Sequence, residues 1–326
     1  MAGTSKEDRP AALLACPLPR EARQALAWHF ELEDAAGLEE PDPAVVAKAL
    51  AGKEVLIASV TLRMDAGFIG RCPPTLKAIG TYSVGHDHVD LDACRHRGIS
   101  VYNTPDVLSD AVAEVALLLL LGAARRVRES VALLESGSWK GWQPTQLVGV
   151  ELAGKTLGIF GMGRIGRAVA DRARCFGMDI HYSSRNRLAP EIEEAAVFHA
   201  HPRSLLAASD ALILACPAND ETRYFLNRER IAWLKLGAIV VNVSRGIVVE
   251  DDALIDALGT GQVKAAGLDV FDGEPKLDGR YLRVPNVFAL PHIGSSTIEA
   301  RTRMAEILAT GITQGLKSMP VANRLA

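Results

Sequence analysis

The chain has 326 residues, of which 48% are hydrophobic and 23% are charged, so it is large enough for about two ordinary domains with apolar cores. The 36 basic residues nearly balance the 39 acidic ones, and no block of like charge indicates a nucleic-acid or membrane-surface partner. The longest apolar run, 115–124, is about half of the roughly 20 residues that a transmembrane helix needs, so we expect a buried helix there.

The ends and the cysteines point to a reducing compartment. The first ten residues, MAGTSKEDRP, are polar, and Pro17 and Pro19 interrupt the apolar stretch that follows, which is not the pattern of a secretory signal. We therefore expect a cytoplasmic protein with buried free thiols and no metal site, because the cysteines form no CxxC pair and no zinc-ligand spacing with histidine. The cysteines are odd in number: Cys16, Cys72, Cys94, Cys175 and Cys216.

The first hundred residues alternate short β-rich runs with amphipathic helical stretches. This alternation is typical of a parallel α/β sheet. The expected strands are 11–16, 55–60, 76–83 and 99–102. We place the end of this series at Asn103-Thr104-Pro105. A residue before a proline is disfavoured in helical geometry, so this segment is expected to separate the last strand from the helix that follows.

A long apolar helix is expected over 109–134, followed by a second α/β series. Its strands are predicted at 155–160, 179–183, 211–214, 239–243 and 265–270. One short strand follows Pro285-Asn286-Val287, and a last helix is expected over 295–317. The fold class is therefore α/β, with two parallel sheets in two domains.

A glycine-rich motif stands directly after the expected strand 155–160 and opens a helix. Its first glycine permits a tight turn, the second lets the backbone approach a pyrophosphate, and the third lets helix and strand pack closely. The helix N-terminus adds N–H groups and a positive dipole that suit phosphates. We predict a dinucleotide site here; the alternative is a glycine-rich turn in an unrelated α/β domain. The motif comprises Gly161, Met162, Gly163, Arg164, Ile165 and Gly166.

The next strand ends in residues that favour NADP(H) over NAD(H). An NAD site usually has an acidic residue about 20 positions after the glycines, and none occurs here. Two guanidinium groups and two hydroxyls stand there instead, a set that suits a 2′-phosphate. NAD(H) is the weaker alternative, and a solvated basic loop is the simpler explanation. The residues are Ser183, Ser184, Arg185 and Arg187.

Three later segments carry charged or titratable residues after apolar strands. They are 241–246 (VNVSRG), 267–275 (GLDVFDGEP) and 290–294 (LPHIG). Together with the glycine motif and with 83–87 (SVGHD), they occur in an order and spacing that resembles the D-isomer-specific 2-hydroxyacid dehydrogenases, and within them the glyoxylate/hydroxypyruvate reductases. The resemblance covers nearly the whole chain.

The resemblance implies that Arg245, Glu274 and His292 are catalytic. Reduction of a ketone needs a hydride donor, a proton donor at the oxygen and a cation for the adjoining carboxylate. Imidazolium suits the proton donor because histidine titrates near neutral pH, and a neighbouring carboxylate favours its charged form. The planar donor fork of Arg245 suits the substrate carboxylate. Taken singly, each of the three has an ordinary structural explanation.

The resemblance also implies further contacts. Val84 and Gly85 match a loop whose amides bind the substrate carboxylate, and Asp269 matches the partner of the nicotinamide carboxamide. Three residues match positions that line the cofactor cleft: Thr104, Cys216 and Pro217. The stretch 137–142 (GSWKGW) resembles one that places a tryptophan in the partner subunit's active site, so Trp142 has either that role or a packing role in a homodimer.

In the family, a Rossmann nucleotide-binding domain is inserted into a flavodoxin-like substrate domain. The resemblance therefore implies an NADP-binding domain at 104–291 and a substrate domain formed by 1–103 plus 292–326, with the active site in a cleft that closes over a small 2-oxoacid. Two alternatives remain: a corepressor-like protein that senses the dinucleotide, and a dehydrogenase of the same fold for another 2-hydroxyacid.

Overall fold

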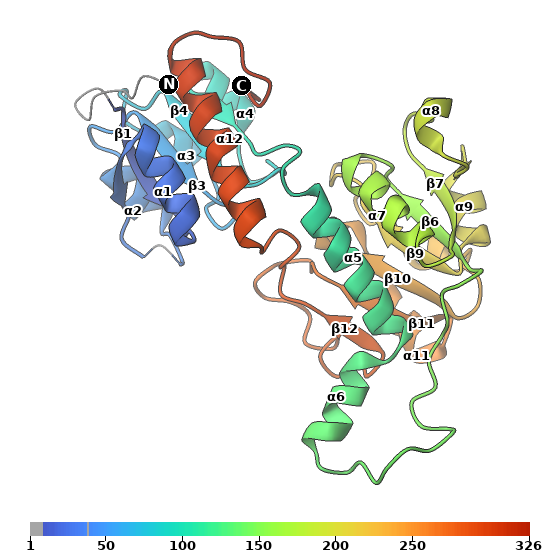
Figure 1. Cartoon of the computed structure of the whole chain (residues 1–326). Helices are drawn as coiled ribbons and strands as arrows, with labels where there is room; N and C mark the ends of the chain where they lie inside the picture. The colour runs from blue at the N-terminus through green and yellow to red at the C-terminus, as the bar shows by residue number, and fades with distance from the viewer. Residues whose placement is uncertain (1–8, 38) are drawn as a thin grey trace. The chain divides into compact units, whose positions relative to one another are not determined.

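The computed structural model describes residues 9–37 and 39–326, and the chain divides into two compact units (Figure 1). One unit comprises Met1–Leu108 and Ser295–Ala326, and the other comprises Ser109–Gly294. The first unit is formed from two separate parts of the chain, as the resemblance implies for the substrate domain, and the second unit is continuous. The predicted domain boundaries stay a prediction. Most of the N-terminal stretch considered for a signal sequence, residues 1–8, lies outside the described residues.

The first unit contains a five-stranded parallel sheet. Its strand order, β2-β1-β3-β4-β5, is the flavodoxin-like order in which the chain winds both ways from the centre. The strands are β1 (Ala11–Ala15), β2 (Glu31–Asp34), β3 (Val55–Ala58), β4 (Ala78–Thr81) and β5 (Ser100–Tyr102). The helices are α1 (Arg20–His29), α2 (Pro43–Ala49), α3 (Ala66–Arg71), α4 (Leu91–His96) and α12 (Ile298–Leu316).

Aspartates begin three of these helices. The Asp65 carboxylate accepts the Phe68 N–H at 2.9 Å, and the Asp90 carboxylate accepts the Ala93 N–H at 2.9 Å. Asp42 does the same for α2. Such side-chain acceptors satisfy N–H groups that have no partner within the helix, so the helix starts are encoded locally.

The position of α12 depends on contacts between distant parts of the chain. This helix packs along α1 and over β4 and β5, and Gly80 of β4 leaves room for the side chains of Ile312 and Leu308 (Figure 1). Periodicity predicted a helix in this stretch but not where it packs, since the complementary surface is formed by residues far away in the sequence.

The second unit contains a seven-stranded parallel sheet with the order β12-β11-β10-β9-β6-β7-β8. This is the Rossmann arrangement, in which the winding direction reverses between β6 and β9. The strands are β6 (Thr156–Phe160), β7 (Asp179–Ser183), β8 (Val197–Phe198), β9 (Ala211–Leu214), β10 (Ala238–Asn242), β11 (Val263–Leu268) and β12 (Val287–Ala289). The helices are α5 (Ser109–Ala124), α6 (Val127–Glu135), α7 (Arg164–Arg174), α8 (Pro190–Glu193), α9 (Pro202–Ala208), α10 (Arg228–Ile231) and α11 (Asp251–Thr260).

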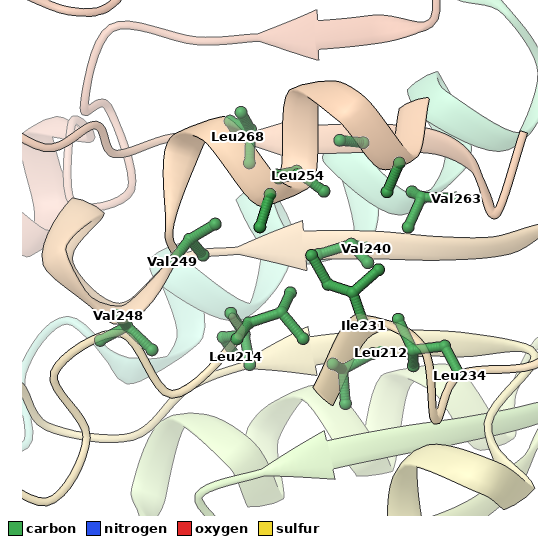
Figure 2. Close-up of a cluster of buried hydrophobic side chains, with 14 of the residues drawn as sticks. Leu212, Leu214, Ile231, Leu234, Val240, Val248, Val249, Leu254, Val263 and Leu268 are labelled. Atoms are coloured by element: carbon green, nitrogen blue, oxygen red, sulfur yellow. The ribbon is translucent and has the colours of Figure 1, made fainter. Parts of the chain in front are cut away.

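The core of this unit lies where helices cover the central strands. Figure 2 shows part of it, in which Leu212 of β9 and Val240 of β10 belong to one cluster with Ile231 of α10 and Leu254 of α11. Strands β9 and β10 are buried along their whole length, as expected for parallel strands covered on both faces.

Some expectations about the elements are wrong. The single helix expected over 109–134 is two helices, because Arg126 adopts a left-handed backbone (φ 56°) between α5 and α6 and its guanidinium pairs with Glu129 in the first turn of α6. Two edge strands, β2 and β8, were not expected. The sequence of β2, ELED, is mostly exposed and has no apolar alternation, and β8 has only two residues.

The cysteine expectation is partly wrong. Cys16, Cys72, Cys94 and Cys216 are buried free thiols, whereas Cys175 is exposed just after α7. That position follows the last helical turn, where the burial pattern of α7 ends.

Within the described ranges, no helix is long and apolar enough to span a bilayer.

Gly267 of β11 offers a test of how closely α5 packs on the sheet. A Cβ atom at this position would lie 2.8 Å from the Leu119 carbonyl oxygen, and backbone atoms of α5 cannot move aside cheaply. We expect Gly267→Ala to destabilise the protein by about 1–3 kcal/mol, measured as a lower melting temperature and denaturant midpoint.

Gly259→Ala is the matched control, because nothing lies within 4 Å of its Cβ position near the end of α11. There, alanine should stabilise the helix by roughly 0.5–1 kcal/mol. Unfolding of Gly267→Ala at or above the parent's midpoint would contradict the close packing.

Candidate active site

The glycine motif forms a tight turn between β6 and α7. Gly161 has φ 102°, and a Cβ atom on it would lie 2.6 Å from the Cys216 backbone nitrogen. A Cβ atom on Gly166 would lie 2.2 Å from the Gly161 carbonyl oxygen. Both glycines are therefore required by packing, since any side chain would push the strand and the helix apart.

The second glycine of the motif, Gly163, faces open space. Nothing lies within 4 Å of the Cβ position of Gly163, which caps α7 without a side-chain hydrogen bond. The first turn of α7 carries no acidic residue, so its N–H groups and helix dipole suit an anion. The turn thus fits a dinucleotide pyrophosphate. Met162 is buried beneath the turn, Ile165 is half-buried and Arg164 is exposed.

The loop after β7 lies next to this turn. The Gly161 N–H donates to the Ser183 carbonyl oxygen at 2.9 Å, which joins the glycine turn to the end of β7. Ser183 is buried, and the Ser184 hydroxyl donates to the Asn186 carbonyl oxygen at 2.6 Å. The loop expected at the adenine ribose is therefore beside the phosphate turn.

The two arginines of this loop differ. Arg187 forms an ion pair with Glu193, with 2.8 Å between Nη2 and Oε2. Arg185 is exposed, and no side-chain partner for it is found among residues 9–37 and 39–326. The sequence grouped these cations as equivalents, whereas in the structure Arg187 is paired with Glu193, although its side chain is 64% exposed.

Cys216 and Pro217 follow β9 and border the glycine turn. The Ser244 hydroxyl donates to the Cys216 carbonyl oxygen at 2.5 Å, and burial raises the pKa of the Cys216 thiol to about 11. The thiol is therefore neutral near pH 7 and unsuited to nucleophilic chemistry. The Pro217 carbonyl oxygen accepts the Thr222 hydroxyl at 2.7 Å, which fixes the start of the next loop.

Glu274 and His292 are in direct contact. Imidazole Nδ1 lies 2.7 Å from Glu274 Oε2, and the other carboxylate oxygen accepts the Phe271 N–H at 2.7 Å. These residues follow β11 and β12, and Arg245 follows β10, so all three arise from the carboxyl ends of neighbouring parallel strands. This is the edge at which open α/β sheets bind ligands.

The charges around Glu274 favour its ionised form. Burial opposes ionisation, but the hydrogen bond with His292, the charges of His292 and Arg245 and the Phe271 N–H outweigh it, so the pKa of Glu274 is lowered from 4.5. The carboxylate can therefore orient the imidazole through its contact with Nδ1. The remaining ring nitrogen, Nε2, is left to exchange a proton.

Asp269 anchors the segment that carries His292. The two oxygens of its carboxylate accept the N–H groups of Ile293 and Gly294, both at 2.8 Å, and its carbonyl oxygen accepts the His292 N–H at 2.8 Å. The Asp269 side chain is 2% exposed, and burial raises its pKa against the opposing effect of the two N–H donors. Its predicted contact with a carboxamide stays a prediction.

Sequence analysis missed residues that shape the Arg245 turn. Asn242 accepts the Ser244 N–H and donates to the Arg245 carbonyl oxygen, both at 3.0 Å. A buried asparagine at the carboxyl end of an apolar strand was the signal that could have identified it. Gly246 has no room for a side chain, because its Cβ would lie 1.8 Å from the Phe271 carbonyl carbon. The Arg245 turn thus packs directly on the segment leading to Glu274.

The predicted substrate loop belongs to the other unit. Ser83 donates to the Gly85 carbonyl oxygen at 2.6 Å, and Asn103 donates to the Val84 carbonyl oxygen at 2.9 Å. Within the part of the chain that the structure describes, the N–H groups of Val84 and Gly85 have no acceptor. Thr104 is fully buried, and its hydroxyl has no partner there.

Trp142 lies in an irregular segment after α6 and is 83% exposed. It makes no aromatic contact among the described residues, and these residues leave most of its ring exposed. No group of three potential metal-ligating side chains was found in those same residues.

Comparisons with known proteins agree on one family. The model of the D-isomer specific 2-hydroxyacid dehydrogenase NAD binding domain matches residues 117–294. Glycerate dehydrogenase of Hyphomicrobium methylovorum is 45% identical over 254 residues, which cover 77% of this chain and 79% of that protein. Glyoxylate reductase of Thermococcus kodakarensis is 40% identical over 308 residues, with 93% and 92% covered.

A solved structure extends the comparison to a cofactor complex. The NADPH-dependent glyoxylate/hydroxypyruvate reductase of Sinorhizobium meliloti, in complex with NADP and malonate, superimposes with a TM-score of 0.86 at 30% identity. The match covers 98% of this chain and 97% of that one. The similarity therefore extends over both units.

The lowered pKa of Glu274 makes a prediction about stability and pH. A carboxylate with a depressed folded-state pKa stabilises the fold at pH values above its unfolded-state pKa, and this contribution is lost as the pH falls through the folded-state value. We expect Glu274→Gln to melt below the parent at pH 7 and the difference to shrink as the pH falls below 4.5. Melting temperatures of the parent and of Glu274→Gln, measured from pH 7 down to acidic pH, give this difference.

The exposed Glu221, changed to Gln, controls for loss of a carboxylate as such. If the difference in melting temperature between the parent and Glu274→Gln does not change with pH, it does not arise from ionisation of Glu274, and the prediction is wrong.

Proposed function

Because the chain belongs to the D-isomer specific 2-hydroxyacid dehydrogenase family, we propose that it reduces a small 2-oxoacid of the glyoxylate or hydroxypyruvate type with NADPH, using His292 as proton donor. The family places it among NAD(P)-dependent oxidoreductases. The observation that carries the proposal is the 2.7 Å contact between His292 and Glu274 at the carboxyl edge of a dinucleotide-binding sheet.

The glycine turn and the loop after β7 would hold the dinucleotide, which would supply the hydride for reduction of the substrate carbonyl. His292 holds the proton at Nε2, since Nδ1 is engaged by Glu274, and transfers it to the carbonyl oxygen as the alcohol forms. The products are the 2-hydroxyacid and the oxidised dinucleotide. Glu274 orients the ring for the transfer through its contact with Nδ1.

Arg245 has the chemistry to bind the substrate carboxylate. Its guanidinium offers a planar donor fork, and the turn that carries it is held by Asn242 and packed on Phe271. The uncommitted N–H groups of Val84 and Gly85 are the remaining proposed carboxylate donors. Thr104, Cys216, Pro217 and Asp269 stay proposed cofactor contacts.

The two relatives are named for different substrates, one as a glyoxylate reductase and the other as a glycerate dehydrogenase. An assay must therefore identify the preferred 2-oxoacid. NADPH oxidation with glyoxylate, hydroxypyruvate, pyruvate, phenylpyruvate and 2-ketogluconate would rank the substrates. A turnover restricted to the bulky acids would reject the proposed substrate class.

The proposal includes a homodimer in the cytoplasm. The exposed ring of Trp142 is compatible with the contact to a partner subunit that the resemblance implies for a homodimer. Sedimentation velocity gives the mass in solution, and a monomer at micromolar concentration would reject the dimer.

His292→Asn tests the proton donor. Asparagine cannot supply a proton near neutral pH, so we expect kcat to fall by at least roughly a hundredfold while the Kd of NADPH stays near the parent value. Stopped-flow turnover and a separate binding titration measure the two quantities. His201→Asn, at an exposed position before α9, is the control. More than half of the parent activity in His292→Asn would remove His292 from the mechanism.

Arg185→Ala tests the cofactor preference. Charge-assisted hydrogen bonds to a phosphate contribute about 1.5–3 kcal/mol, or roughly one to two decades of affinity. We therefore expect the Kd of NADPH to rise tenfold to a hundredfold, and the Kd of NADH to change little because NADH lacks the 2′-phosphate. Calorimetric titration with both cofactors measures this.

Arg283→Ala, which removes another exposed cation, is the control. Equal weakening of both cofactors would mean that Arg185 supports the fold, and a parent enzyme that prefers NADH would reject the NADPH assignment directly.

A further inference from the structure

Glu193 is a buried carboxylate that the proposed reaction does not use. It ends the short helix α8 and is 8% exposed. Asp269 is the other acidic side chain among the buried residues of the described chain, and it is accounted for by the segment that carries His292. A buried carboxylate costs stability unless it is paired and hydrogen-bonded, so its partners indicate what it holds in place.

Two side chains from the loop region bind this carboxylate. The hydroxyl of the fully buried Tyr182 donates to Oε1 at 2.5 Å. Arg187 donates through Nε to Oε1 at 3.0 Å and through Nη2 to Oε2 at 2.8 Å, in the two-pronged geometry that is strongest for an arginine and a carboxylate. The guanidinium also lies over the ring of Phe198, 5.8 Å from its centroid.

These contacts close the loop between β7 and α8. The Tyr182 hydroxyl accepts the Leu188 N–H at 3.0 Å, so the end of the loop is held by the same group that donates to Glu193. At the start of the loop, Ser183 is bonded to the glycine turn, and Ser184 is bonded to Asn186. Arg185 is the cation between these fixed points, with its side chain exposed.

Arg187 is a poor candidate for the 2′-phosphate in this arrangement. To reach a phosphate with its fork, it would have to leave Glu193, and a buried carboxylate without its cation is strongly destabilising. The hydrogen bonds from Arg187 and then from Tyr182 lower the pKa of Glu193, so the carboxylate is ionised at neutral pH and the pair persists there. Arg187 is therefore held by Glu193 although its side chain is 64% exposed, whereas the exposed Arg185 has no side-chain partner among the described residues.

We propose that Glu193 is a positioning residue for cofactor selectivity: through Arg187 and Tyr182 it fixes the loop after β7 so that Arg185 meets the 2′-phosphate of NADPH. The inference rests on the proposed NADPH preference. It assigns the two arginines different tasks, one that holds the loop and one that binds the phosphate. Preorganisation of the loop lowers the entropy that must be lost when the phosphate binds.

Glu193→Gln is the direct test, because glutamine keeps the shape of the side chain but cannot form the ion pair with Arg187. We expect the Kd of NADPH to rise roughly tenfold and the Kd of NADH to stay within about twofold, both measured by calorimetry on the full chain. Glu191→Gln is the matched control, because Glu191 is an exposed acid in the same short helix.

A double variant separates positioning from direct binding. If Glu193 acts through Arg185, the double variant Glu193→Gln/Arg185→Ala should bind NADPH with nearly the same Kd as Arg185→Ala alone, since the phosphate contact is already lost. Tyr182→Phe is the milder second variant if Glu193→Gln does not fold, because it removes one hydroxyl and keeps the buried ring. Tyr182→Phe should raise the Kd of NADPH by a smaller factor than Glu193→Gln does.

The remaining outcomes overturn the inference. Equal weakening of NADPH and NADH would make Glu193 a structural residue, and tighter NADPH binding would mean that Glu193 competes with the phosphate for Arg187. Fully additive losses in the double variant would also overturn it. A parent with no preference for NADPH removes the cofactor assignment and this inference together, whereas a preference that survives in Glu193→Gln removes the inference alone.

Discussion

The carboxylate of Asp269 is the group on which the candidate active site depends most. It accepts two backbone N–H groups from the segment after β12, and its own backbone N–H donates to the Asn242 carbonyl oxygen at 3.1 Å. One buried residue therefore links the ends of β10, β11 and β12. His292 adopts a left-handed backbone (φ 54°), which a residue other than glycine keeps only when its surroundings fix it. The contacts of Asp269 therefore help to fix the backbone of His292 beside Glu274.

The parallel sheet explains why the functional segments meet. Every strand of the second unit runs in the same direction, so the chain leaves each strand at one edge. The glycine turn, the loop after β7 and the turns that carry Arg245, Glu274 and His292 all begin there. Close backbone contacts, such as that between Gly246 and Phe271, then hold neighbouring turns tightly against one another.

Spacing along the chain proved a poor guide to the task of a charged side chain. Arg185 and Arg187 are two residues apart and look equivalent in the sequence, yet Arg187 is held by Glu193. Whether a cation is available to a ligand depends on which anion packs beside it, and that anion comes from a separate element. The same reasoning applies to Cys175, whose exposure depends on where the burial of α7 ends.

The sequence by itself determined the α/β class, the strands β1, β3 to β7 and β9 to β12, and the glycine turn. These features are written in local patterns: apolar runs, glycines required by steric contact and motifs at set spacing. The three residues proposed for catalysis came from a family resemblance and stay a proposal. Tertiary structure alone decided the edge strands β2 and β8, the break at Arg126, the packing of α12, the role of Asn242 and the partner of Arg187. Each of these depends on groups that only folding brings together, so no local pattern in the sequence encodes it.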